Sequence, residues 1–145
     1  MIKSGGIILF LKPIFLIFIL LFSVYSYSQD ISGTYRWSYD NGRNNFEIYL
    51  SAKNAVRGST PTSFKGEHCG VFDDGQRMDC SYEEFSINLN KVSQNVFTGT
   101  ILSAYARTIH DIKVTYLPAT DQIHWEVTLQ RSGQIYFPLN VIMDK

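Results

Sequence analysis

The stretch Phe64–Leu89, FKGEHCGVFDDGQRMDCSYEEFSINL, is the most informative part of this 145-residue sequence. Its two arms have the composition of extended strands. Asp73-Asp74-Gly75-Gln76 between them is a turn signal, because Asp and Gly tolerate a positive φ. Counting outward from the centre of this turn sets Cys69 opposite Cys80. The stretch therefore predicts a β-hairpin with one cysteine on each strand.

The same count predicts two further cross-strand pairs in this hairpin. Lys65 falls opposite Glu84, which pairs opposite charges, and Phe64 falls opposite Phe85, which pairs two aromatic rings. Both kinds of pair stabilise neighbouring strands. We expect the rest of the chain to consist of more hairpins of this kind.

The two cysteines are expected to form a disulfide. A Cys69–Cys80 bridge closes a loop of about 12 residues and would stabilise the fold by roughly 3 kcal/mol in the loop-entropy picture. The alternative is a reactive thiol with His68 as its base. Neighbours along a strand point to opposite faces, however, so His68 is badly placed to activate Cys69.

Residues 1–28 have the layout of a secretory signal peptide. Two lysines precede an apolar run at 13–24, and Ser26 and Ser28 supply small residues at alternate positions before a cleavage site. The alternative is an uncleaved signal anchor, because the apolar run approaches the roughly 20 residues that span a bilayer. We expect cleavage, export to the periplasm or the extracellular space, and a mature domain at 29–145.

The mature part, about 117 residues, has the size of one domain. The whole chain carries 13 basic and 13 acidic side chains, and removing Lys3 and Lys12 leaves 11 basic against 13 acidic. These charges are scattered along the sequence. They form neither the basic stripe that nucleic acid requires nor a polybasic membrane patch, so neither partner is expected.

The segments Ile31–Tyr39 and Asn44–Ala52 alternate between apolar and polar residues around Asn41-Gly42, a strong hairpin signal. Folding about this turn matches apolar side chains with apolar ones and opposite charges with each other. The predicted pairs are Trp37 with Phe46, Tyr35 with Ile48, and Arg36 with Glu47.

The segments Ile109–Leu117 and Gln122–Gln130 predict a second hairpin, around the turn Pro118–Asp121. A three-residue turn with Gly133 in the left-handed conformation then leads to a last strand from about Gln134 to Met143. The predicted pairs are Val114 with Trp125, Ile112 with Val127, Lys113 with Glu126, Leu129 with Ile135, and Val127 with Phe137.

Together these patterns predict an all-β fold of about eight strands, with no helix outside the leader. Consecutive hairpins with one apolar face form an antiparallel up-and-down meander, which can close as a lipocalin-like barrel or fold over as a sandwich; we expect the barrel. Closure removes exposed strand edges. Pro138 lacks an N–H group and so argues against perfect closure. The expected barrel is therefore closed or partly open.

No catalytic residue, metal site or cofactor is predicted. His124 and Glu126 share a strand face, but Lys113 is the expected partner of Glu126, and a metal needs further ligands. His110 and Asp111 are sequence neighbours and diverge on a strand. A hydrolytic dyad would also need a serine in a strained strand-to-helix turn, which this sequence does not indicate.

Seven aromatic residues are expected to point into the barrel. An eight-stranded interior can be filled by side chains or can hold one small ligand. Rings that each bury about 150–250 Å² favour filling. The functional alternative is an apolar ligand pocket lined by Tyr35, Trp37 and Trp125. The full set is Tyr35, Trp37, Phe46, Phe85, Phe97, Trp125 and Phe137.

The opening Ser32-Gly33-Thr34-Tyr35-Arg36-Trp37 resembles the first strand of calycins (lipocalins, fatty-acid-binding proteins and avidins), in which a glycine precedes a tryptophan at a barrel end. Here the tryptophan lies four residues after Gly33, and Tyr35 occupies the position two residues after it. The resemblance therefore implies a barrel but transfers no ligand site.

A wider resemblance covers most of the mature chain. Its strand motifs are similar to those of a family of short exported bacterial proteins of unknown function, which implies a secreted β-rich domain without known activity or catalytic residues. Cys69 and Cys80 are not part of that pattern. The motifs are Gly33-Thr34-Tyr35 with Trp37, 46–50 (FEIYL), 114–117 (VTYL), 123–125 (IHW) and 137–143 (FPLNVIM).

Three functional hypotheses follow from the sequence. The first is a non-enzymatic binding or interaction module of unknown partner that acts through the barrel mouth and the protruding tip at 70–78. The second is a calycin-like carrier of a small apolar ligand inside the barrel. The third, with least support, is a hydrolase whose site is assembled from separate strands.

Overall fold

The computed structural model describes residues 30–81 and 85–145; the predicted signal peptide, 1–28, lies outside them. Within these ranges the chain forms nine strands and no helix. All strand pairs are antiparallel. The strands are β1 Gly33–Tyr39, β2 Asn44–Ala52, β3 Ser63–Phe72, β4 Arg77–Ser81, β5 Ile87–Ser93, β6 Val96–Leu102, β7 Ile109–Leu117, β8 Gln122–Leu129 and β9 Asn140–Asp144.

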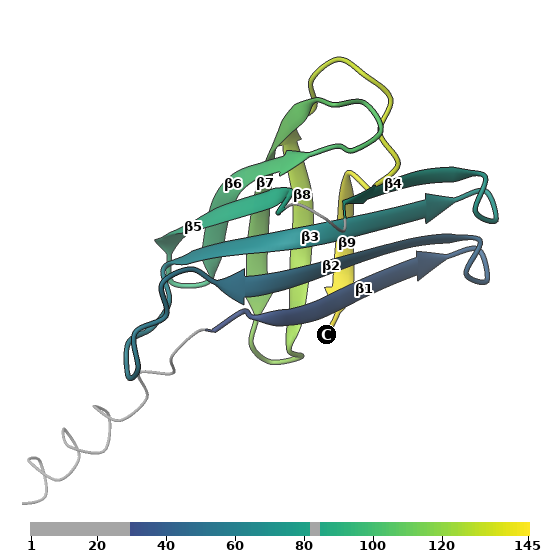
Figure 1. The fold of residues 1–145 in the computed structure, drawn as a ribbon. Helices are drawn as coiled ribbons and strands as arrows, with labels where there is room; N and C mark the ends of the chain where they lie inside the picture. Colours follow the sequence, from purple (N-terminus) through teal and green to yellow (C-terminus); the bar gives the residue numbers. More distant parts are fainter. Residues whose placement is uncertain (1–29, 82–84) are drawn as a thin grey trace, which may run out of the picture.

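Eight of these strands form a closed up-and-down barrel, and β4 is an additional strand (Figure 1). The barrel strands follow chain order from β1 through β3 and then from β5 through β9, which pairs with β1. β3 has 10 residues and uses its two halves differently. Its first half pairs with β5 and its second half with β4. The predicted all-β meander is therefore confirmed.

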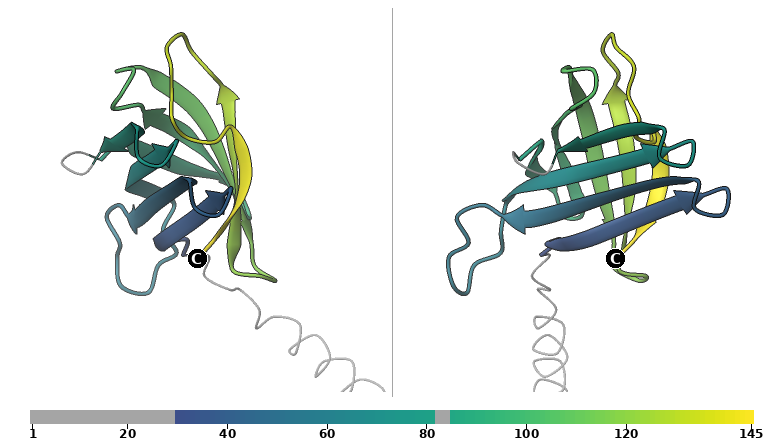
Figure 2. Two further views of the ribbon diagram at one scale, coloured as in Figure 1. Left: turned by 90° about the vertical axis from the view of Figure 1, so that its right-hand side faces the viewer. Right: turned by 45° about the vertical axis from the view of Figure 1, so that its right-hand side comes forward.

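The hairpins β1–β2 and β3–β4 cross the other strands and extend together beyond β9 (Figures 1 and 2). Their tips, 40–43 and 73–76, are joined directly. The Arg43 guanidinium donates to the Asp74 carboxylate at 3.0 Å, and the Asp74 N–H donates to the Arg43 carbonyl at 3.2 Å. The two tips therefore form one projection beside the barrel mouth.

The registers of the two hairpins with short turns are confirmed. β1 and β2 pair Trp37 with Phe46 and Arg36 with Glu47, as predicted. β7 and β8 likewise have the predicted pairs, including Lys113 with Glu126. In the first turn Asp40, Asn41 and Gly42 all have a positive φ, which is the conformation that this turn sequence favours.

The predicted disulfide is present, but the register predicted beyond it is wrong. Cys69 and Cys80 pair across β3 and β4 and are bonded. Further along, Phe64 pairs with Leu89 rather than Phe85, and Lys65 pairs with Asn88. β4 ends at Ser81, and the first half of β3 pairs with β5, which begins only at Ile87, so counting from the turn no longer gives the partner. The predicted partner Glu84 lies outside the described residues.

Phe85 was also wrongly predicted to point inward. Its side chain is 47% exposed, and the Lys65 ammonium lies 3.8 Å from the centroid of its ring. Such a cation–π contact needs no burial. Phe85 lies before β5 and in no strand, so strand alternation does not apply to it.

The last strand is shorter than predicted. Residues 130–139, which we call the strap, cross the barrel mouth without regular structure, and β9 begins at Asn140. The predicted pairs Leu129–Ile135 and Val127–Phe137 are therefore wrong. Instead the Val127 N–H donates to the Leu139 carbonyl at 2.7 Å, and Trp125 pairs with Val141.

The barrel interior is packed with large apolar side chains. Ring centroids are 5.4 Å apart for Phe64 and Phe97 and 5.2 Å apart for Phe46 and Trp125. Of the seven rings predicted to point inward, five are buried, Trp37 is partly buried and Phe85 is exposed. The buried five are Tyr35, Phe46, Phe97, Trp125 and Phe137.

Removing the disulfide should destabilise the fold measurably. The double variant Cys69→Ala/Cys80→Ala is expected to lose about 3 kcal/mol of unfolding free energy, because the unfolded chain regains the freedom of a loop of about 12 residues. Urea denaturation under oxidising conditions measures this loss. Reduced wild type serves as a control and should match the variant. An unchanged urea midpoint in both would contradict the structural role of the bridge.

Candidate functional site

The three residues predicted to line a ligand pocket have different surroundings. Tyr35 and Trp125 are fully buried. The Tyr35 hydroxyl donates to the Ile31 carbonyl at 3.1 Å, and the Trp125 indole N–H donates to the Pro138 carbonyl at 2.9 Å. Burial, together with nearby Asp121, raises the pKa of Tyr35. Both polar groups therefore already have partners within the protein.

Trp37, by contrast, belongs to a series of aromatic rings at the barrel mouth, which we call the aromatic row. The ring centroids are 6.3 Å apart for Tyr39 and Trp37, 6.4 Å for Trp37 and Phe72, 6.4 Å for Phe72 and Tyr136, and 4.7 Å for Tyr136 and Tyr105. Tyr39 is 66% exposed and Tyr105 55%, whereas Tyr136 between them is buried. The row therefore presents rings to solvent at both of its ends.

A small hollow adjoins Trp37 on the β1–β2 hairpin. Its volume is about 250 Å³. Four of the six residues that line it carry polar or charged side chains, and the Phe46 side chain beneath it is fully buried. The six lining residues are Arg36, Trp37, Ser38, Asn45, Phe46 and Glu47.

The charges on the two hairpin tips neutralise one another. Arg43 lies 3.4 Å from Asp40 and 3.0 Å from Asp74, and Arg77 lies 3.1 Å from Asp73. These side chains are all about half exposed, so each pair contributes little to stability. Their effect is a rim of alternating donors and acceptors at the end of the aromatic row.

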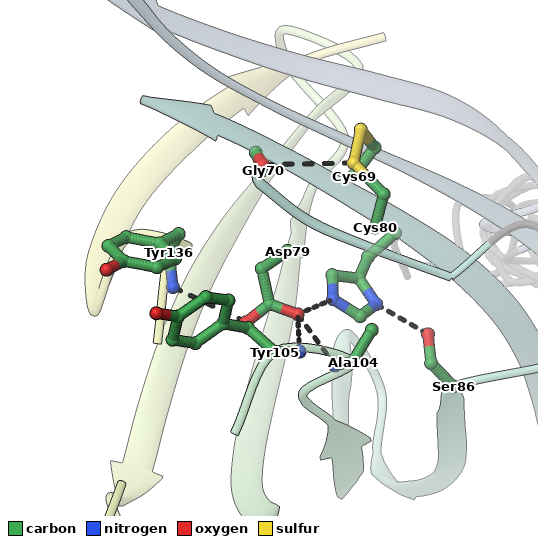
Figure 3. Close-up of a disulfide and its surroundings, with 9 residues drawn as sticks. Cys69, Gly70, Asp79, Cys80, Ser86, Ala104, Tyr105 and Tyr136 are labelled. Atoms are coloured by element: carbon green, nitrogen blue, oxygen red, sulfur yellow. Dashed lines mark hydrogen bonds and ion pairs between the residues drawn. A yellow bond between two sulfur atoms is a disulfide. The ribbon is translucent and has the colours of Figure 1, made fainter. Parts of the chain in front are cut away.

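The row rests on the buried carboxylate of Asp79 in β4 (Figure 3). Its Oδ1 accepts hydrogen bonds from His68 Nε2 at 3.2 Å, from the Ala104 N–H at 2.7 Å and from the Tyr105 N–H at 3.2 Å. Its Oδ2 accepts from the Ser103 hydroxyl at 2.6 Å and from the Tyr136 N–H at 3.4 Å. One side chain thus fixes β3, the 103–108 loop and the strap relative to β4.

These donors keep Asp79 ionised. Burial raises the pKa of the carboxyl group, but the hydrogen bonds from His68 and Ser103 outweigh burial, and the net pKa is lowered. An ionised carboxylate only accepts hydrogen bonds, so His68 Nε2 carries a proton. The other ring nitrogen, Nδ1, lies 2.6 Å from the Ser86 hydroxyl oxygen.

Ser86, His68 and Asp79 are the residue types of a nucleophilic triad, but their surroundings are structural. Ser86 is 3% exposed and His68 is 2% exposed. The backbone N–H groups nearest the cluster donate to Asp79, whereas an oxyanion hole needs donors that point at a reacting atom. In the described part of the chain this cluster therefore orders loops rather than exposing a nucleophile.

Sequence reasoning missed this cluster. His68 was considered only as a partner for Cys69, and Asp79 was not considered at all. The available signal was an aspartate at an inward position of a strand, where Asp is depleted. Its donors come from positions 25 and 57 residues away in the sequence, so no local pattern identifies them.

His110 is a second buried polar group at the mouth. The Arg131 N–H donates to its Nδ1 at 3.1 Å, so Nε2 carries the ring proton and faces the Thr108 hydroxyl at 2.8 Å. Burial lowers the pKa of His110, against the opposing effects of Asp79 and Asp111. The Phe137 ring lies between the two imidazoles, 5.6 Å from His68 and 5.8 Å from His110.

The other candidates from the sequence form no site. Glu126 pairs with Lys113, and His124 Nε2 lies 2.8 Å from the Asn140 side-chain oxygen. Among the described residues, no three His, Cys, Asp or Glu side chains are grouped so that they could hold a metal ion. In the same ranges no helix is long and apolar enough to cross a membrane.

No protein-family model, no curated protein and no solved structure matches this chain. The resemblances noted in the sequence therefore stay predictions.

Replacing Asp79 by Asn should destabilise the protein strongly. The amide of Asn has the same shape but places an NH₂ group among hydrogen-bond donors. Because this breaks a buried charged network, we expect the free energy of unfolding to fall by about 3 kcal/mol. The pKa of Asp79 is lower in the folded protein than its unfolded value of 3.8. The ionised carboxylate therefore stabilises the fold fully above pH 3.8, and this stabilisation is lost as the pH falls through the folded pKa. Urea unfolding at pH 7 tests the prediction. Asp40→Asn, at an exposed position, is the control. Equal losses of unfolding free energy in the two variants would contradict the structural role of Asp79.

Acidification should destabilise the strap through His110. Its folded pKa is lowered, so the unfolded chain binds a proton that the folded state does not, and stability falls as the pH drops below about 6.5. The slope is at most about 1.4 kcal/mol per pH unit for one proton. Unfolding free energies between pH 7.5 and 5 measure it. His110→Gln should have a smaller slope of unfolding free energy against pH than wild type, and the control His124→Gln should have the wild-type slope. The same slope in wild type and both variants would exclude a role of His110 in the pH dependence.

Proposed function

We propose that this chain is an exported, non-enzymatic binding module that contacts its partner through the aromatic row and the two hairpin tips. The observation that carries the proposal is the exposure of tyrosine rings at both ends of a continuous series of ring contacts. Aromatic side chains, Tyr and Trp above all, supply much of the energy in protein interfaces. A tyrosine that served only the core would be buried.

The contacts that hold the aromatic row and the tips in place favour a rigid binding surface. Asp79 fixes the backbone of Tyr105 and Tyr136, and the Arg43–Asp74 contact joins the tips. Groups held in place before binding lose less conformational entropy when the partner arrives. The barrel mouth with its 70–78 tip is thus suited to binding without rearrangement.

Export agrees with the covalent structure. The Cys69–Cys80 bridge is of the kind that persists in an oxidising compartment, outside the cytosol. The leader pattern at 1–28 points in the same direction. We therefore assign the module to the periplasm or the extracellular space.

The alternative function, a carrier of a small apolar ligand, has weaker support. The ring centroids of Phe46 and Trp125 are 5.2 Å apart, and those of Phe46 and Phe137 are 5.9 Å apart. The strap brings Phe137 into this position from the mouth. A ligand inside the barrel would have to displace these contacts and the Trp125 hydrogen bond to Pro138.

Tryptophan fluorescence can separate the two functions, because the chain has two tryptophans and only Trp37 lies in the row. We expect cellohexaose or a proline-rich decapeptide to change the emission of wild type but not that of Trp37→Phe. Palmitate, the apolar control, should change neither. A palmitate response that persists in Trp37→Phe would identify Trp125 as the reporter and support the carrier. If none of the three ligands changes the tryptophan emission of wild type, the proposal of a binding module is contradicted.

A further inference from the structure

We propose that the ligand of the aromatic row is a neutral oligosaccharide chain. This inference rests on the proposed function of the same surface and specifies the class of partner. Three features favour it: the spacing of the rings, the chemistry of the rim, and the balance of charge.

The ring spacing fits a chain of sugar units. The centroids of Tyr39 and Trp37 are 6.3 Å apart, and their ring planes are within 4° of parallel. The centroid distance is similar to the length of one hexose in an extended chain. A pyranose presents a face of C–H groups, which packs on the electron-rich face of an aromatic ring. Tyr39 and Trp37 at one end and Tyr105 at the other are the rings with accessible surface for this contact.

The rim offers both donors and acceptors. The carboxylates of Asp40, Asp73 and Asp74 only accept hydrogen bonds, and the guanidinium groups of Arg43 and Arg77 only donate. Sugar hydroxyls do both, so a glycan can satisfy either kind of group.

The same rim disfavours a proline-rich peptide, the other partner that binds aromatic grooves. Prolines have no N–H group, so such a peptide presents mainly carbonyl acceptors. The carboxylates of Asp40, Asp73 and Asp74 would then lack donors from the ligand. Their arginine partners would have to serve both the protein and the peptide.

The charge balance selects a neutral chain. Each arginine of the tips is already paired with an aspartate, and the tips carry three aspartates against two arginines. At the tips no excess of positive charge is left for an acidic glycan or for nucleic acid, whose affinity depends on Lys and Arg contacts to phosphate. Binding is therefore expected to depend weakly on salt.

The test is a titration of the mature chain with neutral hexasaccharides of glucose and of N-acetylglucosamine, followed by Trp37 emission. We expect saturable binding by at least one of them, weakened at least tenfold in Tyr39→Ala and less than threefold in Tyr39→Phe, which keeps the ring. Tyr49→Ala is the matched control, because Tyr49 is 47% exposed on the outward face of β2, away from the row. It should bind like wild type.

The outcomes separate this inference from the proposed function. If a proline-rich peptide binds in a Tyr39-dependent way and neither hexasaccharide does, the glycan assignment is wrong and the binding module stands. If the hexasaccharides bind but Tyr39→Ala and Tyr49→Ala behave alike, the row is not the site and both proposals fail. Absence of binding by saccharides and peptide also overturns both.

Discussion

The buried carboxylate of Asp79 is the constraint on which the barrel mouth depends. A charge without solvent is costly unless donors surround it, and here they come from β3, the 103–108 loop and the strap. A loop that moves away takes its hydrogen-bond donors from the buried charge. One side chain on the additional strand β4 therefore orders segments that the strand ladders do not reach, and the Cys69–Cys80 bridge holds β4 itself on β3.

The strap connects the interior to the surface within two residues. Tyr136 joins the aromatic row, and Phe137 enters the core between His68 and His110. This path requires a glycine on β3, because a Cβ on Gly70 would lie 1.7 Å from the Tyr136 carbonyl oxygen. The close approach of the strap to β3 thus closes the mouth and sets the position of Tyr136 in the row.

The sequence predicts the parts of this fold that local rules decide. Hairpins such as β1–β2 follow from a turn with positive φ and from apolar and charged pairs on either side. The prediction fails where a strand has two partners, as β3 does, and where the strap at 130–139 takes the place of the predicted strand. The candidate site was only half predicted: Trp37 and the 70–78 tip were identified, but the Asp79 cluster depends on distant backbone donors that no local pattern reveals.

Barrel closure explains why the row is exposed at all. β1 and β9 share a single residue pair, Arg36 with Asp144, whereas β1 and β2 share seven. Beyond Arg36, the residues from Trp37 to Tyr39 are paired with β2 only. A complete ladder to β9 would draw these residues into the barrel wall, and edge strands are otherwise usually protected by charge or cover. Here the paired charges of the tips protect the edge, and the short pairing of β1 with β9 leaves the rings accessible. Local departures from ideal packing of this kind are expected where a fold serves recognition.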